Sequence, residues 1–119
     1  MLEKLIRYGA IADILGPEPD GSILEVGAGP HGLGCCLPYP FVGVDTWYPD
    51  PPLPQNKAIK ASGTDLPFRD RSFDYVLCIE VLEHLPPELR PRIVSEMCRV
   101  SRKMVIITHP YGLSARVAM

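Results

Sequence analysis

Residues 23–34, with the sequence ILEVGAGPHGLG, constrain the fold more than any other stretch of the chain. The apolar run Ile23–Val26 stops at a loop that contains Gly27, Gly29 and Gly32. This pattern predicts a buried parallel strand and a loop whose backbone approaches a ligand closely, because glycine lacks Cβ and permits positive φ. A nucleotide-type ligand suits such a loop. The same glycine spacing occurs in ordinary strand-to-helix turns, so the rest of the sequence has to decide between the two interpretations.

Length and composition limit the class of protein. A chain of 119 residues predicts a single domain, 1–119, and a net charge of −2 offers no basic surface for nucleic acid or an anionic membrane. No apolar run approaches the ~20 residues of a membrane span. Glu3 and Lys4 stand where a secretory signal would be apolar. We therefore expect a cytoplasmic protein with a small-molecule partner. The cysteine spacing predicts reduced thiols and no metal site: Cys35, Cys36, Cys78 and Cys98.

Helix and strand patterns alternate along the chain. Apolar residues at helical spacing predict an amphipathic helix over residues 2–15 and another through Leu89–Val100. The second helix carries four charged residues on its solvent-facing side: Arg90, Arg92, Glu96 and Arg99. Short apolar runs predict five strands: residues 23–26, 41–45, 58–61, 73–79 and 103–108. Prolines limit the helix after the first strand to one or two turns and replace the helix after the second with a loop, residues 46–56.

These elements predict an α/β fold, a Rossmann-like open parallel sheet with the strand order 3-2-1-4-5. Ligands then bind at the carboxyl ends of strands 1 and 2, where the order reverses. Residues 112–119 are too few for two further strands, so we expect a sheet that is truncated relative to seven strands. The outer edge of strand 5 would then present unpaired N–H and C=O groups, which predicts a homodimer through that edge.

Four pieces of the chain follow one another in order: EVGAG at 25–29, Asp45, GTDLPF at 63–68 and FDYVLCIEVLEHL at 73–85. Together they resemble the class I S-adenosylmethionine-dependent methyltransferases, especially the small-molecule branch that includes quinone-biosynthesis methyltransferases. The resemblance covers Ile23 to about Thr108. It implies an enzyme that uses S-adenosylmethionine as cofactor and transfers its methyl group to an acceptor that the sequence does not identify.

The resemblance assigns the first piece to the methionine part of the cofactor. Glu25 would lie near the methionine amino group, and Gly27, Ala28 and Gly29 would let the backbone meet the cofactor. The sulfonium and ammonium groups are both cationic, so Glu25 and Glu80, at adjacent strand ends, would supply a complementary field.

The next two pieces would bind the adenosine part. One ionised carboxylate accepts hydrogen bonds from two vicinal hydroxyls, and the resemblance gives this role to Asp45. Trp47, just past Asp45, is placed to stack on adenine. In GTDLPF the resemblance implies that Asp65 accepts from the adenine amino group and that the Leu66 N–H meets the ring.

Methyl transfer is an in-line displacement on an activated methyl group, so positioning supplies most of the acceleration and a base serves only a poor nucleophile. The candidates for such a base are His109 and Glu80. One alternative is a non-catalytic or partner-dependent S-adenosylmethionine-binding module. Another is an NAD-binding domain, since the glycines and Asp45 also satisfy that fingerprint. Glu25 and Glu80 disfavour NAD because they would repel its pyrophosphate.

Overall fold

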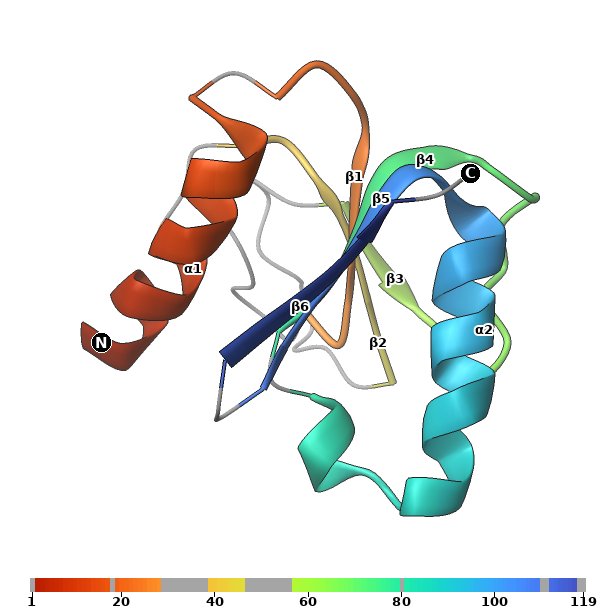
Figure 1. The fold of residues 1–119 in the computed structure, drawn as a ribbon. Coiled ribbons are helices and arrows are strands. Elements are labelled where there is room, and N and C mark those ends of the chain that lie inside the picture. Colours follow the sequence, from red (N-terminus) through yellow and green to blue (C-terminus); the bar gives the residue numbers. More distant parts are fainter. Residues whose placement is uncertain are drawn as a thin grey trace.

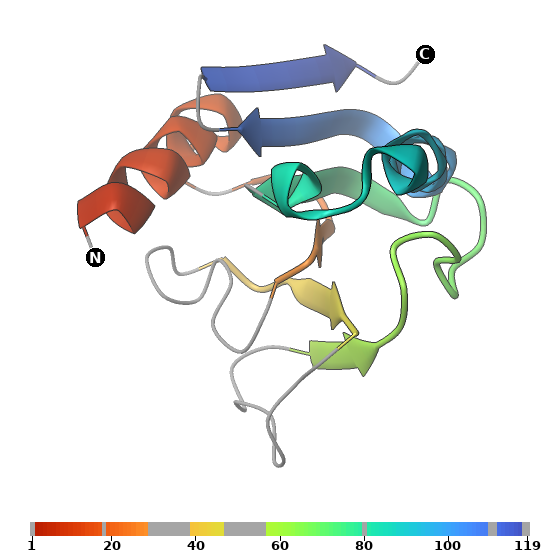
Figure 2. The same ribbon diagram turned by 90° about the horizontal axis from the view of Figure 1, so that it is seen from below.

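In the computed structural model, one sheet with the order β3-β2-β1-β4-β5-β6 runs through the molecule (Figure 1). Its strands are β1 (Ile23–Val26), β2 (Val42–Asp45), β3 (Lys57–Lys60), β4 (Phe73–Ile79), β5 (Ser101–His109) and β6 (Gly112–Val117). The first five strands are parallel, which confirms the predicted order 3-2-1-4-5. Figure 2 shows β3 at one edge of the sheet and β6 at the other. The structure describes residues 2–17, 19–28, 39–46, 57–79, 81–109 and 112–117.

Helices α1 (Leu2–Leu15) and α2 (Arg90–Val100) lie on opposite sides of the sheet (Figure 1). Two short 3-10 turns, η2 (Leu82–His84) and η3 (Pro87–Leu89), lead from β4 into α2. Within the described ranges, no helix has both the length and the apolar character needed to cross a membrane.

Side chains of the central strands alternate between two hydrophobic clusters, one under each helix. On the α1 side, Ile11 packs with strand residues that include Ile23, Leu77 and Ile106. On the α2 side, a second cluster joins helix and strand residues: Ile93, Met97 and Val100 with Leu24, Val76 and Val105. This alternation is the period-two pattern of strands that are covered on both faces. Because β1 to β5 are parallel, their carboxyl ends lie on the same side of the sheet.

The expectation that the outer edge of strand 5 is bare is wrong. Strand β6 pairs antiparallel with β5 from His109 opposite Gly112 to Met104 opposite Val117. An antiparallel neighbour needs only a short connection, whereas a parallel one needs a crossover, so even a few residues after β5 suffice for a sixth strand. The homodimer expected at the strand 5 edge loses this argument and stays a prediction.

Other expectations differ in their bounds or fall outside the described residues. Strand β5 begins at Ser101 rather than Lys103, and β3 ends at Lys60 rather than Ala61. The short helix expected after β1 and most of the proline-rich loop expected after β2 correspond to residues 29–38 and 47–56, which the structure does not describe.

Candidate functional site

A pocket of about 200 Å³ opens at the carboxyl ends of β1 and β2. Its walls come from these strand ends, from the segment that follows β3 and from the residues that lead from β4 into α2. The pocket lies at the edge of the sheet where the sequence predicts a ligand, and its lining includes Gly27, Asp45, Ser62 and Thr64.

Gly27 forms the turn at the end of β1 and lines the pocket. Its φ is +75°, and a Cβ at this position would lie 2.6 Å from Cγ2 of Val81. Only glycine satisfies both conditions. The N–H groups of Gly27 and Ala28 donate to the carbonyl oxygen of Val44 at 2.7 and 3.2 Å. In the described part of the glycine loop, the backbone is therefore bound to β2, and the glycine permits the turn and the close packing against Val81.

Asp45 ends β2 and lines the pocket beside Thr46. The Thr46 hydroxyl donates to Asp45 Oδ1 at 3.4 Å, and the N–H of Ala61 donates to the Asp45 carbonyl oxygen at 3.0 Å. The second bond ties the segment after β3 to the end of β2. Asp45, the residue predicted to bind the ribose, thus lines the pocket. Hydrogen bonds hold the backbone at this position.

Glu25 lies in β1 and is 1% exposed. It is not among the residues that line the described pocket. Burial, together with the negative charges of Glu25 and Glu83, raises the pKa of the Cys78 thiol to about 12. Cys78 is therefore a protonated core thiol at neutral pH, as the sequence predicts. Glu25 and Glu83 are thus close enough to Cys78 to act on its thiol electrostatically.

Asp65 and Leu66 lie away from the pocket. Asp65 is exposed and is not part of the pocket lining, and the Leu66 N–H donates to Glu96 Oε1 at 2.9 Å. The residues that face the pocket come earlier, from Ala61 to Thr64, directly after β3. Ser62 Oγ and Thr64 Oγ1 lie 2.7 Å apart, and the Thr64 N–H donates to Ser62 Oγ at 3.2 Å. Their position at the end of a predicted strand is the signal that could have identified them, as it identified Asp45.

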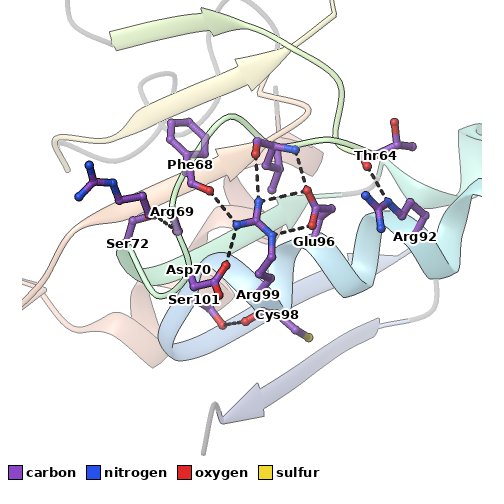
Figure 3. Close-up of polar contacts among 11 residues, drawn as sticks. Thr64, Phe68, Arg69, Asp70, Ser72, Arg92, Glu96, Cys98, Arg99 and Ser101 are labelled. Carbon is purple, nitrogen blue, oxygen red and sulfur yellow. Dashed lines mark hydrogen bonds and ion pairs between the residues drawn. The ribbon is translucent and has the colours of Figure 1, made fainter.

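The charged side of α2 is not simply solvent-facing, which corrects the expectation for Glu96. Glu96 is 4% exposed, and Arg99 Nε donates to its Oε2 at 2.7 Å (Figure 3). The hydrogen bond from Arg99 lowers the pKa of Glu96, against the opposite effect of burial. Arg99 also donates to the carbonyl oxygens of Phe68 and Leu66, at 2.7 and 3.0 Å. The segment after β3 is therefore fastened to α2 by charged groups.

The remaining predicted site residues lie outside what the structure describes. Gly29, Trp47 and Glu80 are among the residues without a description, and His109 is described only as the last backbone position of β5. Their predicted roles stay predictions.

Comparison with known proteins adds an independent line of evidence. A family model for the methyltransferase domain matches residues 24–107. An uncharacterized methyltransferase from Mycobacterium sp. (strain JLS) is 34% identical over 131 residues, which cover 90% of this chain and 47% of that protein. The chain thus spans about half the length of the curated relatives it matches.

Solved structures share the fold. The PH0226 protein from Pyrococcus horikoshii OT3 superposes with a TM-score of 0.71 at 20% identity, covering 88% of this chain and 56% of its own. A structure described as a SAM-dependent methyltransferase from Methanosarcina mazei gives a TM-score of 0.66 at 20% identity, covering 84% and 56%.

Gly27→Ala should lower the free energy of unfolding by about 1–3 kcal/mol, because the new Cβ meets Val81 and the backbone keeps a positive φ. Urea denaturation measures the change. The matched control is Gly9→Ala in α1, where a Cβ meets nothing within 4 Å and alanine should stabilise the helix by about 1 kcal/mol. A Gly27→Ala protein as stable as the parent would show that this turn is not held in the left-handed region.

The Glu96 carboxylate should stabilise the fold only while it is ionised. Its folded-state pKa lies below the ordinary 4.5, so its contribution is fully present above that value and is lost as the pH falls through the lowered pKa. Glu96→Gln cannot titrate. We expect the stability difference between the parent and this variant to be largest at neutral pH and to shrink as the pH falls below 4.5.

Denaturant titrations across that range measure the difference, with the exposed Glu88→Gln as the control for loss of one negative charge. A parent-to-Glu96→Gln difference that stays constant with pH would contradict the ionic role of Glu96.

Proposed function

Since this chain belongs to the methyltransferase domain family, we propose that it binds S-adenosylmethionine in the pocket at the ends of β1 and β2. We further propose that the protein transfers the methyl group to a small-molecule acceptor. The observation that carries the proposal is Asp45, a carboxylate at the end of β2 that lines a pocket at the carboxyl edge of a parallel sheet.

The chemistry of the described residues fits an adenosyl group. The lining combines the carboxylate of Asp45 and the hydroxyl residues Thr46, Ser62 and Thr64 with apolar side chains such as Val26, Leu89 and Ile93. This mixture suits a flat apolar base joined to a sugar with two hydroxyls. The volume of about 200 Å³ is below the 300–1,000 Å³ of whole-ligand pockets, so the described residues would hold part of the cofactor. Gly29, Trp47 and Glu80 are proposed to complete the site.

Each residue would contribute binding or orientation. Bound S-adenosylmethionine supplies a methyl group that its sulfonium already activates. Asp45 accepts hydrogen bonds from the two ribose hydroxyls and so fixes the rotation of the sugar. The buried charge of Glu25 favours a cation near the end of β1. The apolar wall that includes Ile93 excludes water from the ring. Positioning of this kind accounts for methyl transfer without a protein base for a good nucleophile.

We propose that residues Ser62–Thr64, rather than Asp65 and Leu66, contact the edge of the adenine ring. Ser62, Gly63 and Thr64 line the pocket, whereas the Leu66 N–H is already bound to Glu96. Hydroxyl groups both donate and accept, so Ser62 and Thr64 can pair with either type of group on the adenine edge.

Two other functions stay open to experiment. A non-catalytic S-adenosylmethionine-binding module would use the same pocket without turnover. An NAD-binding domain is disfavoured, because a pyrophosphate needs N–H donors and those of Gly27 and Ala28 are already bound to the Val44 carbonyl oxygen. The buried charge of Glu25 would also repel a pyrophosphate.

Calorimetric titration should show binding of S-adenosylmethionine and S-adenosylhomocysteine, and much weaker binding of NAD, because the acids of this site suit a cation and two hydroxyls. Adenosine serves as the control for nucleoside binding alone. Tighter binding of NAD than of S-adenosylhomocysteine would overturn the proposed function.

Asp45→Ala should weaken S-adenosylhomocysteine binding by about 1.5–3 kcal/mol, or ten- to a hundredfold, through the loss of a charge-assisted contact. Asp65→Ala is the matched control, since it removes an exposed carboxylate near the same loop. We expect its affinity to stay within about twofold of the parent. If Asp65→Ala instead binds S-adenosylhomocysteine more weakly than Asp45→Ala does, Asp65 contacts the adenine edge and our assignment of that contact to Ser62–Thr64 fails.

A further inference from the structure

We propose that Arg92, Glu96 and Arg99 of α2 are positioning residues that set the affinity of the pocket by holding its wall, residues 61–64. The proposal rests on the proposed function, because it concerns affinity for the adenosyl ligand. It assigns a role in binding to three side chains that lie behind the wall rather than in the pocket.

The three side chains bind successive main-chain groups of the segment that follows β3 (Figure 3). Arg92 Nε donates to the carbonyl oxygen of Thr64 at 2.8 Å. Glu96 Oε1 accepts from the Leu66 N–H at 2.9 Å, and Arg99 reaches the Leu66 and Phe68 carbonyl oxygens. Positions 92, 96 and 99 share one face of a helix, so α2 presents them as a row alongside the segment.

The bond from Arg92 acts on the backbone of the wall itself, and those of Glu96 and Arg99 act on the residues that directly follow the wall. The Ala61 N–H is bound to the Asp45 carbonyl oxygen, and the Asp65 N–H donates to the Ser62 carbonyl oxygen at 3.1 Å, which closes the turn. At its far end the Thr64 carbonyl oxygen is held by Arg92. The wall thus spans from β2 to α2 and has one anchor on each. Loss of the Arg92 bond would remove the hydrogen bond that ties the wall's own main chain to α2, and only the bonds of Glu96 and Arg99 beyond the wall would remain.

Helix α2 also contributes to the pocket directly through Ile93, which neighbours Arg92. A Cβ built on Gly63 would lie 3.1 Å from Val26 and 3.4 Å from Ile93, so the wall already packs closely against β1 and α2. Arg92, Glu96 and Arg99 therefore hold the wall against α2, and a bound adenine ring would contact both of these surfaces. A carboxylate as buried as Glu96 would be costly without partners, and here Arg99 and the Leu66 N–H both pair with it.

A control variant exists at the start of β5. The Arg102 side chain is 49% exposed and donates to the Arg71 carbonyl oxygen at 3.0 Å and to Asp74 Oδ1 at 3.2 Å. Like Arg92 it is an exposed arginine that ties down a loop carbonyl, but neither Arg71 nor Asp74 lines the pocket. The Arg71 N–H donates to the Arg99 carbonyl oxygen, so this control keeps the main-chain link of its loop to α2. Arg102→Ala therefore removes a comparable anchor without touching residues 61–64.

The experiment measures S-adenosylhomocysteine affinity by calorimetry, together with the exchange rate of the Leu66 amide by nuclear magnetic resonance in the ligand-free protein. We expect Arg92→Ala and Arg99→Lys each to weaken binding about three- to tenfold, and Arg99→Lys to speed exchange at Leu66. Glu96→Gln should retain much of the affinity, because its amide oxygen still accepts from the Leu66 N–H. Arg102→Ala should bind within about twofold of the parent even where its melting temperature falls.

Parent-like affinity in both Arg92→Ala and Arg99→Lys would overturn the proposal, and so would an equal loss in Arg102→Ala. Because Arg92 is exposed, its alanine variant should fold even if Arg99→Lys does not. A parent chain that binds no S-adenosylhomocysteine would overturn the proposed function instead. The exchange rates would then still decide whether α2 positions the wall, since unchanged exchange at Leu66 in Arg99→Lys would reject that separately.

Discussion

The link that buried Glu96 makes between α2 and the main chain of Leu66 is the contact on which the geometry of the site depends most. Glu96 is 4% exposed, and it joins the Arg99 guanidinium to the main chain of Leu66. A charge at such depth persists only when its partners stay in place, so it couples the orientation of α2 to the path of the chain after β3. The orientation of α2 and the path of the chain after β3 also depend on the apolar cluster that contains Ile93 and Met97, which α2 buries against the sheet. The polar and apolar contacts of one helix thus act together on one wall of the pocket.

A second constraint comes from the backbone of β1. Gly27 turns with a positive φ, and its N–H is bound to Val44, so the chain leaves β1 directly against the end of β2. That proximity places Asp45 at the mouth of the pocket. Val81, which follows β4, packs against the same glycine. Three strands therefore meet at one residue that has no side chain, and any side chain there would push them apart.

Sequence patterns predicted the elements whose information is local. Apolar runs bounded by turn residues gave β1 and β4 with the bounds that the structure shows, and helical periodicity gave α1. Strand β6 was missed because its pairing with β5 is decided by a free sheet edge rather than by its own composition. Glu96 was misjudged for a related reason. Periodicity classes a charged residue as exposed, and only the tertiary fold brings Leu66 and Arg99 to it.

The candidate site shows the same difference between what local sequence patterns predict and what the tertiary fold decides. Asp45 was identifiable because it ends a strand whose position the sequence makes plain. The resemblance assigned the adenine edge to Asp65, whereas the described pocket is lined by Ser62 and Thr64. The predicted end of β3 lay one residue too late, and such a boundary influences which residues face the pocket.

Residues that position the wall of a pocket respond to substitution differently from a residue that contacts the ligand. Asp45 would act by direct contact, so its removal deletes hydrogen bonds from every bound molecule. Arg92 and Arg99 would act on the fraction of molecules whose wall is already in place, and the apparent dissociation constant rises in inverse proportion to that fraction. The first effect depends on the ribose hydroxyls of the ligand, whereas the second is the same for any ligand that contacts Ser62–Thr64. Ligands that differ only in their hydroxyls therefore separate the two kinds of residue in this pocket.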